Sequence, residues 1–106
     1  MGNLSALLAL VVAGPIVQSP SPEHPAWDIA CKRGAPVHAV FDGTLRAHRS
    51  ARMGNQITLE GNHHTAYYAH LQSVLPASEV MKGDVIGTCG STGTWSYGPH
   101  VHFEVK

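Results

Sequence analysis

The sequence predicts an all-β fold, either a compact antiparallel sheet or a two-sheet sandwich. The 106 residues include 11 glycines and 7 prolines, which suit turns between short strands. Several short segments alternate apolar and polar residues, as strands with one buried face do. No segment has the length and 3.6-residue periodicity of a core helix, and we expect at most one helical turn, near Ala77–Met81. Short connections between successive strands favour antiparallel pairing.

The charge balance argues against a nucleic-acid-binding protein. The chain has 7 Lys and Arg and 7 Asp and Glu, so its formal net charge is zero. Its arginines are scattered, whereas a nucleic-acid-binding domain concentrates positive charge on one face. The unusual residue type is histidine, with eight copies.

We divide the chain into an apolar N-terminal segment, residues 1–18, and a folded domain, residues 19–106. Leu4–Val17 is almost wholly apolar but short, and it contains a glycine and a proline, so we expect no stable membrane span. One interpretation of the segment is a signal-like region with a cleavage site at Ala13, although no basic residue precedes it. The other is a first strand near Pro15–Gln18, packed under the sheet.

Asp42-Gly43 is typical of a two-residue hairpin turn. It separates Pro36–Phe41 from Thr44–His48, and we therefore expect these two segments to pair with each other. A further short strand is expected at Val85–Cys89.

A second pair of strands is predicted at Gln56–Glu60 and His63–Leu71. The first alternates cleanly, and Gly61-Asn62 begins the turn that follows it. On the second strand, alternation places His70 on the same face as Ala66 and Tyr68.

The C-terminal segment carries His100 and His102 after a glycine-rich loop. Alternation puts both histidines and Glu104 on one face of the strand. The apolar residues that alternate with them lie on the other face. Two imidazoles about 7 Å apart on one strand allow one to bind a metal while the other lies beside a metal-bound water. The alternative is a solvent-facing histidine pair on an edge strand.

A second candidate pair is His24 and Asp28, which follow a Ser/Pro-rich approach segment. Pro25 favours extended backbone between them, and their even spacing allows both side chains to share one face. Without the other histidines, a loop histidine and a turn aspartate would be the simpler interpretation.

Taken together, these motifs resemble those of the lysostaphin-like zinc metalloendopeptidase family. The similarity runs from about His24 to Lys106, and the joint occurrence of His-x-x-x-Asp, Tyr-x-His-Leu and His-x-His makes it specific. The resemblance implies a compact antiparallel fold of the duplicated hybrid motif type and cleavage of peptide bonds in bacterial peptidoglycan. The matching segments are His24-Pro25-Ala26-Trp27-Asp28-Ile29-Ala30, Gly34-Ala35-Pro36-Val37, Asp42-Gly43, Gly54-Asn55, Tyr68-Ala69-His70-Leu71, Lys82-Gly83-Asp84-Val85-Ile86-Gly87, Thr92-Gly93 and Gly98-Pro99-His100-Val101-His102-Phe103-Glu104.

The resemblance implies that His24, Asp28 and His102 bind one zinc ion per chain. It makes His70 and His100 the unligated catalytic histidines beside the metal. Two imidazoles and one carboxylate leave the fourth zinc position for water, whose pKa the metal lowers toward neutrality. No His-Glu-x-x-His helix supplies a glutamate base, so His70 or His100 would accept the proton of the water and stabilise the oxyanion.

Other polar residues have less specific interpretations. Glu104 either orients a ligand imidazole or is a solvated carboxylate. Cys31 and Cys89 are the only cysteines, and they either form a disulfide, as in an exported enzyme, or are two buried thiols. The remaining histidines match no site position and are expected at the surface or in strand packing; they are His38, His48, His63 and His64.

These features predict a zinc-dependent peptidoglycan endopeptidase that acts in the cell envelope, the periplasm or the extracellular space, or on a phage particle. The alternative is a non-catalytic relative that binds cell wall or a partner through the same groove, as a phage or envelope component. A histidine-rich metal-binding module without hydrolysis is a third hypothesis, but the Gly-Ser-Thr-Gly loop at 90–93 argues against it, because a mere metal binder needs no open substrate groove. Retention of all five histidine and aspartate positions favours the enzyme.

Overall fold

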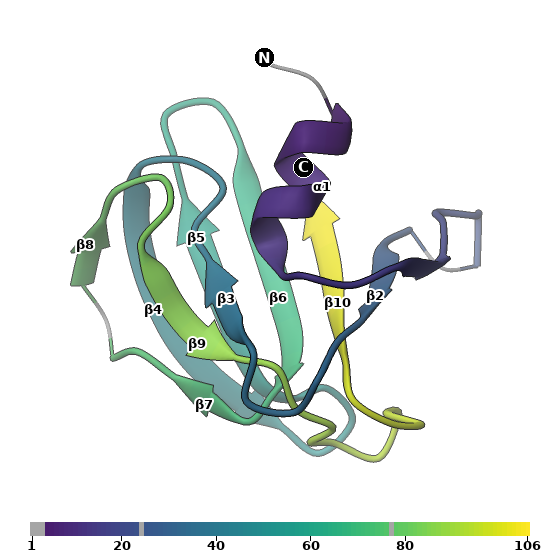
Figure 1. The fold of residues 1–106 in the computed structure, drawn as a ribbon. Helices are drawn as coiled ribbons and strands as arrows, with labels where there is room; N and C mark the ends of the chain where they lie inside the picture. Colours follow the sequence, from purple (N-terminus) through teal and green to yellow (C-terminus); the bar gives the residue numbers. More distant parts are fainter. Residues whose placement is uncertain (1–3, 24, 77) are drawn as a thin grey trace.

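The structure is a computed structural model that describes residues 4–23, 25–76 and 78–106. In these residues one helix and ten strands form, and the strands make two antiparallel sheets around one core (Figure 1). The all-β prediction is confirmed. The elements are α1 (Leu4–Val11), β1 (Ile16–Gln18), β2 (Trp27–Ala30), β3 (Pro36–His38), β4 (Gly43–Ser50), β5 (Gly54–Glu60), β6 (Thr65–Leu71), β7 (Ser73–Val74), β8 (Ser78–Val80), β9 (Val85–Thr88) and β10 (His100–Val105).

The two sheets differ in size and face each other. Within the described residues the larger sheet has the strand order β1-β2-β10-β6-β5-β4-β8, and the smaller one has the order β3-β9-β7. Figure 1 shows the smaller sheet lying over β4 and β5. Val37 and Ile86 from the smaller sheet are fully buried in the same cluster as Leu45 and Ile57 from the larger one.

Alternating burial along β5 and β10 confirms the faces that the sequence predicts for these strands. Ile57 and Leu59 are fully buried on β5. On β10 Val101 and Phe103 are fully buried, whereas His100 and His102, which alternate with them, are half-buried. The core therefore takes one face of β10 and leaves the other face for polar side chains.

Tyr68 joins the two sheets through its ring and its hydroxyl. The ring packs edge-on against Phe103, with centroids 5.1 Å apart. The hydroxyl donates to the carbonyl of His38 at 3.0 Å and accepts from the backbone N–H of Val40 at 3.2 Å. Burial raises the pKa of Tyr68, so the hydroxyl keeps the proton that it donates.

The predicted hairpin around Asp42-Gly43 is wrong. β3 pairs with β9, and β4 pairs with β5 and β8, so the two segments belong to different sheets. The Asp42 carboxylate accepts from the backbone N–H of Lys82 at 2.7 Å. A Cβ atom at Gly43 would lie 2.4 Å from the carbonyl oxygen of Glu60. Here glycine serves the close approach of two strands rather than a hairpin turn.

The helical expectations are also corrected. Leu8, Val11 and Val12 on and after α1 are buried against the core, and a helix of eight residues depends on such packing because alone it is unstable. The helical turn expected near Ala77–Met81 is wrong, since Ser78–Val80 is strand β8 on the edge of the sheet; Ala77 itself lies outside the described residues. Within the described ranges no helix combines membrane-spanning length with sufficient hydropathy.

The N-terminal strand lies at the edge of the larger sheet. β1 pairs with β2, and all three of its residues are exposed. The segment therefore forms an exposed edge strand. The strand interpretation of the sequence expected it to pack under the sheet, and that part of the expectation is wrong.

Cys31 and Cys89 form a disulfide, which removes the alternative of two buried thiols. The bond joins the chain just after β2 to the chain just after β9. Both cysteines lie next to the chain around His100. The N–H of Cys31 bonds to the carbonyl of Pro99, and Gly90, which follows Cys89, forms a β-bridge with His100.

We predict that removing this crosslink destabilises the fold. The bond spans a sequence separation of 58 residues, and the chain-entropy account gives such a crosslink about 4 kcal/mol at most. The double variant Cys31→Ser/Cys89→Ser should unfold at a lower temperature than the oxidised wild type in thermal denaturation. Reduced wild type is the matched control and should melt with the double variant. Equal melting of oxidised and reduced protein would contradict the prediction.

Candidate active site

The register of β10 brings Asp28 and His102 together. β10 lies between β2 and β6, and His102 is directly opposite Asp28 on one side and Ala69 on the other. Opposed residues in antiparallel strands point to the same face. As a result, Nδ1 of His102 lies 3.4 Å from Oδ1 of Asp28.

His100 joins this pair from two residues earlier on the same face. Its Nε2 lies 3.7 Å from the same oxygen of Asp28. The side chains of Asp28, His100 and His102 are 15%, 13% and 17% exposed. These three side chains are therefore mostly buried, and a small part of each reaches the surface.

His70 reaches the same cluster because β6 carries a bulge. Ile57 is opposite Tyr68, but Asn55 is opposite Leu71, so β6 has one more residue than β5 between these two pairs. His70 has a left-handed backbone with φ of 65°, a conformation that costs a residue other than glycine about 1–3 kcal/mol. The prediction that His70 shares a face with Tyr68 is wrong, because the extra residue turns its side chain to the opposite face.

The His70 ring is buried among the other histidines. Its centroid lies 4.9 Å from that of His100 and 5.9 Å from that of His102, and the residue is only 2% exposed. Burial is the main factor that lowers the pKa of His70, and the two neighbouring histidines act in the same direction. The hydrogen bond to Thr92 and the charge of Asp28 act in the opposite direction.

The loop after β9 and the turn between β4 and β5 hold the bulge in place. Nδ1 of His70 bonds to the carbonyl of Thr92 at 2.8 Å, and the backbone N–H of His70 bonds to the carbonyl of Met53 at 2.8 Å. The hydroxyl of Thr92 donates to the carbonyl of Leu71 at 2.7 Å and accepts from the N–H of Asn55 at 3.0 Å. Together these contacts hold the backbone of His70 in its left-handed conformation.

Both His70 and His100 are held in the same tautomer. Nδ1 of His100 bonds to the carbonyl of Gly98 at 2.9 Å, as Nδ1 of His70 does to the carbonyl of Thr92. A carbonyl only accepts, so Nδ1 carries the proton in each ring. The Nε2 atom of each neutral ring is then unprotonated and able to accept a proton or bind a metal.

Four of the five residues that the sequence singles out therefore lie together: Asp28, His70, His100 and His102. The fifth, His24, lies outside the described residues. Among the described residues, no group of three or more His, Cys, Asp or Glu side chains is arranged to hold a metal ion.

Asp28 and His102 nevertheless fit two adjacent positions around one zinc ion. Ligand atoms at roughly 2.0–2.2 Å from a tetrahedral zinc lie about 3.4 Å apart. The measured separation between Oδ1 and Nδ1 is 3.4 Å. An imidazole and a carboxylate are also donors that zinc prefers.

Thr92 and Gly98, which orient the rings, lie in segments that match the family, but their residue types do not predict this role. Thr92 and Gly98 act through backbone carbonyls, which any residue type possesses. The carboxylate of Glu104 pairs with Nζ of Lys106 at 3.2 Å.

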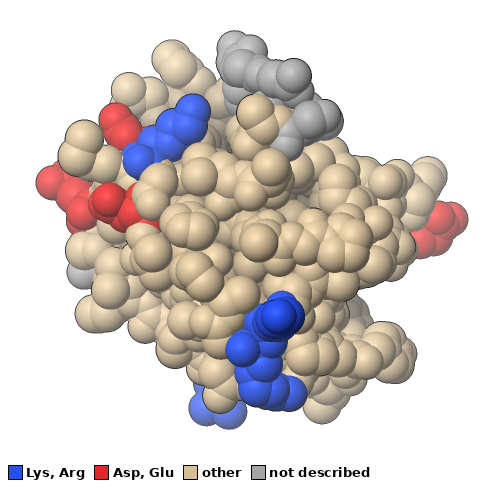
Figure 2. Space-filling model, in the orientation of Figure 1, with Lys and Arg blue, Asp and Glu red and all other residues tan. Residues whose placement is uncertain are grey.

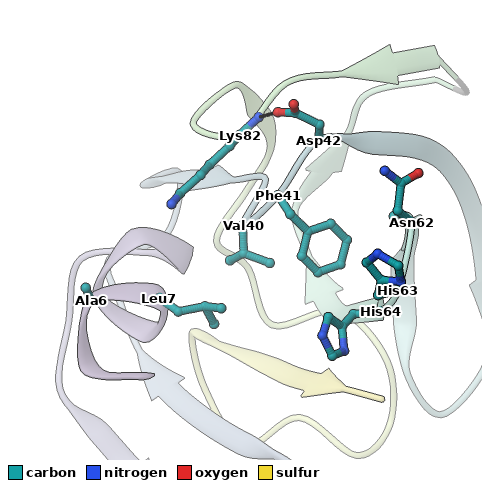
Figure 3. A pocket seen from close by; sticks show the side chains of 10 residues that line it. Ala6, Leu7, Val40, Phe41, Asp42, Asn62, His63, His64 and Lys82 are labelled. Carbon is teal, nitrogen blue, oxygen red and sulfur yellow. Dashed lines mark hydrogen bonds between the residues drawn. The ribbon is translucent and has the colours of Figure 1, made fainter. Parts of the chain in front are cut away.

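A separate cavity of ≈ 540 Å³ lies between α1 and the turn after β5. Figure 3 shows Leu7, Val40 and Phe41 along it, with His63 and His64 on the turn. None of the four clustered site residues lines it. The histidines that match no motif position thus include two at this cavity, and His48 bonds to the hydroxyl of Thr58 on an exposed strand face.

Residues 22–106 match peptidase family M23. The chain belongs to this family. The family resemblance inferred from the sequence is therefore confirmed. The matched residues of this M23 chain include all four clustered site residues.

Individual relatives agree in sequence and in fold. The M23 chain is 38% identical over 86 residues to the DD-carboxypeptidase/endopeptidase Mpg of Neisseria meningitidis, a match that covers 78% of this chain and 20% of the relative. The lysostaphin catalytic domain of Staphylococcus simulans superposes with a TM-score of 0.75 at 30% identity, covering 99% of this chain and 86% of that one. A zinc-containing peptidase of Vibrio cholerae gives a TM-score of 0.77 at 29% identity, covering 87% of this chain and 33% of that one.

The chain spans 25% and 20% of the length of two curated relatives that it matches. The similarity therefore describes the M23 domain that they share.

Proposed function

We propose that this chain is a zinc-dependent endopeptidase that hydrolyses peptide bonds in bacterial peptidoglycan. The observation that carries the proposal is the common face of β2, β10 and the β6 bulge, where a carboxylate and three imidazoles meet. Membership of peptidase family M23 supports peptide hydrolysis. The relatives support the substrate class, since one is a DD-carboxypeptidase/endopeptidase and another an antimicrobial peptidase.

His24, Asp28 and His102 would hold the zinc ion. When bound, zinc polarises the scissile carbonyl and lowers the pKa of a bound water toward neutrality. The chain contributes the donor geometry, because the cross-strand register fixes Asp28 and His102 next to each other.

His70 and His100 would handle the protons of the reaction. The unprotonated Nε2 of either ring can accept the proton of the attacking water, and a protonated ring can donate to the tetrahedral oxyanion. The carbonyls of Thr92 and Gly98 stabilise this orientation by accepting from Nδ1. Low exposure of His70 keeps water from replacing these hydrogen bonds.

The disulfide supports action outside the cytoplasm. Disulfides persist in oxidising compartments such as the periplasm and the extracellular space, and Cys31 and Cys89 are bonded. We therefore propose the cell envelope, the periplasm or the extracellular space as the site of action, with a phage particle as the alternative. Peptidoglycan is the partner in each case.

The second candidate function is cell-wall binding without turnover. A binding module would need the groove but not two unprotonated Nε2 atoms. Retention of the strained backbone of His70, which places its ring beside His100, favours the enzyme.

We expect the purified protein to bind close to one zinc ion per chain. Asp28→Ala and His102→Ala should lose it, because each removes one of three ligands, while His70→Ala and His100→Ala should retain it. Metal analysis of the purified variants measures this. The control is His48→Ala, which removes an exposed histidine whose Nε2 bonds to the hydroxyl of Thr58. Full zinc occupancy in both ligand variants would show that the ligand assignment is wrong.

We expect the two unligated histidines to be required for turnover but not for wall binding. His100→Ala and His70→Ala should each slow hydrolysis by about 10²- to 10⁴-fold, the usual contribution of a general acid or base. Zymography and release of soluble fragments from walls of defined cross-bridge chemistry, with and without chelator, measure the rate. Sedimentation with intact walls measures binding.

His70→Asn is the matched variant for the bulge, since asparagine tolerates a left-handed backbone but has no imidazole. It should fold like the wild type and still lose turnover. If His100→Ala and His70→Asn cut walls at the wild-type rate with zinc bound, the mechanism fails and the binding function becomes the better account.

A further inference from the structure

Arg33 lies in a tight turn between β2 and β3. The N–H of Ala35 bonds to the carbonyl of Lys32 at 2.9 Å, which closes the turn. Gly34 has φ of 87°, as the third residue of a type II turn requires. The position of the Arg33 Cα atom is thereby set by the local backbone.

The turn is also attached to the end of β9. The N–H of Gly34 donates to the carbonyl of Cys89 at 2.8 Å, and the N–H of Cys89 donates to the carbonyl of Ala35 at 2.8 Å. The disulfide from Cys31 reaches the same residue. The base of the Arg33 side chain is therefore rigid relative to the loop that leads to His100.

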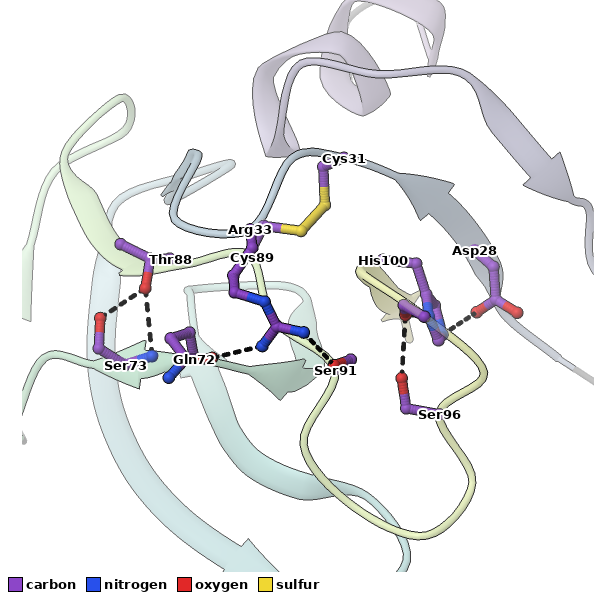
Figure 4. The surroundings of a disulfide bond; sticks show 11 residues. Asp28, Cys31, Arg33, Gln72, Ser73, Thr88, Cys89, Ser91, Ser96 and His100 are labelled. Atoms are coloured by element: carbon purple, nitrogen blue, oxygen red, sulfur yellow. Dashed lines mark hydrogen bonds and ion pairs between the residues drawn. A yellow bond between two sulfur atoms is a disulfide. The ribbon is translucent and has the colours of Figure 1, made fainter.

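Two neutral side chains orient the guanidinium of Arg33. Nη1 donates to Oε1 of Gln72 at 3.0 Å, and Nη2 donates to Oγ of Ser91 at 2.9 Å. Figure 4 shows the guanidinium between these two residues, beside the disulfide and at the start of the loop that returns to His100. Within the described residues these are the side chains that it bonds, and neither carries a negative charge.

The charge and part of the hydrogen-bonding capacity of Arg33 thus remain available. A guanidinium has five N–H donors, and the two bonds to Gln72 and Ser91 use two of them. The residue is exposed. Figure 2 shows Lys and Arg side chains over the turn between β2 and β3, with no Asp or Glu side chain beside them on this face.

Both partners of Arg33 are close to the histidine cluster along the chain. Gln72 is two residues after His70, so their Cα atoms are at most about 7 Å apart. Ser91 immediately precedes Thr92, whose carbonyl accepts from the His70 ring. The two partners of the guanidinium therefore lie next to the segments that carry His70 and its hydrogen-bond acceptor.

We propose that Arg33 is a specificity-determining residue that binds a free carboxylate of the substrate peptide. This inference rests on the proposed function and deepens it. An oriented guanidinium binds a carboxylate through two parallel hydrogen bonds, which a lysine ammonium does not match. The substrate would be a carboxylate-bearing stem peptide rather than an uncharged glycine bridge.

Two pairs of synthetic peptides test the proposal. The first pair is a cross-linked stem peptide with free carboxylates and the same peptide with every carboxylate amidated. The second pair consists of non-cleavable analogues of both. Calorimetry of the zinc-loaded wild type with the analogues should show about tenfold tighter binding of the carboxylate form, the effect of one charged hydrogen-bonded contact.

Arg33→Gln should remove this preference and leave the affinity for the amidated analogue unchanged. Arg33→Lys should recover only part of it, because the ammonium lacks the planar fork. Lys32→Gln, which removes the neighbouring charge in the same turn, is the control and should keep the wild-type preference. Melting temperature and zinc content should match the wild type in all three variants.

Equal binding of both analogues by the wild type, or an equal loss for both in Arg33→Gln, would overturn the role of Arg33. Cleavage of the two cleavable peptides tests the proposed endopeptidase function separately. Wild type that binds the carboxylate analogue selectively but cleaves neither peptide supports Arg33 as the carboxylate site and contradicts the endopeptidase.

Discussion

The hydrogen bond from Nδ1 of His70 to the carbonyl of Thr92 is the contact on which the site depends. It holds the one described residue other than glycine that has a left-handed backbone, and it selects the tautomer of the ring. The contacts at Met53, Leu71 and Asn55 hold the same bulge, which breaks the regular alternation that would place His70 on the core face beside Tyr68. The cluster of imidazoles therefore requires the bulge in β6.

The rest of the site follows from strand order. β10 lies between β2 and β6, so His102 meets Asp28 on one side and the small Ala69 on the other. The disulfide and the turn at Arg33 then tie the end of β9 to the chain after β2. This crosslink fixes the loop that supplies the acceptors of both His70 and His100.

Local patterns in the sequence were sufficient for the pairing of β5 with β6 and for the buried faces of β5 and β10. They failed at Asp42-Gly43, because the turn signal is local while β3 pairs with β9, far away in the chain. They also missed α1, whose stability comes from burying Leu8 and Val11 rather than from its own periodicity. The meeting of Asp28 with His102 came from family resemblance, since a pairing between distant strands leaves no local trace. The bulge at His70 depends on contacts from Met53 and Thr92 that no spacing encodes.

The central claim is that the protein holds His70 and His100 with Nδ1 protonated and Nε2 bare, beside a metal bound by His102. Nitrogen-15 NMR of the ring nitrogens in the zinc-loaded protein tests this most directly. The account predicts Nδ1–H, Nε2-bare rings at His70 and His100, and zinc on Nδ1 of His102, the atom that faces Asp28. Nε2–H tautomers at His70 and His100, or zinc bound to either ring, would contradict it.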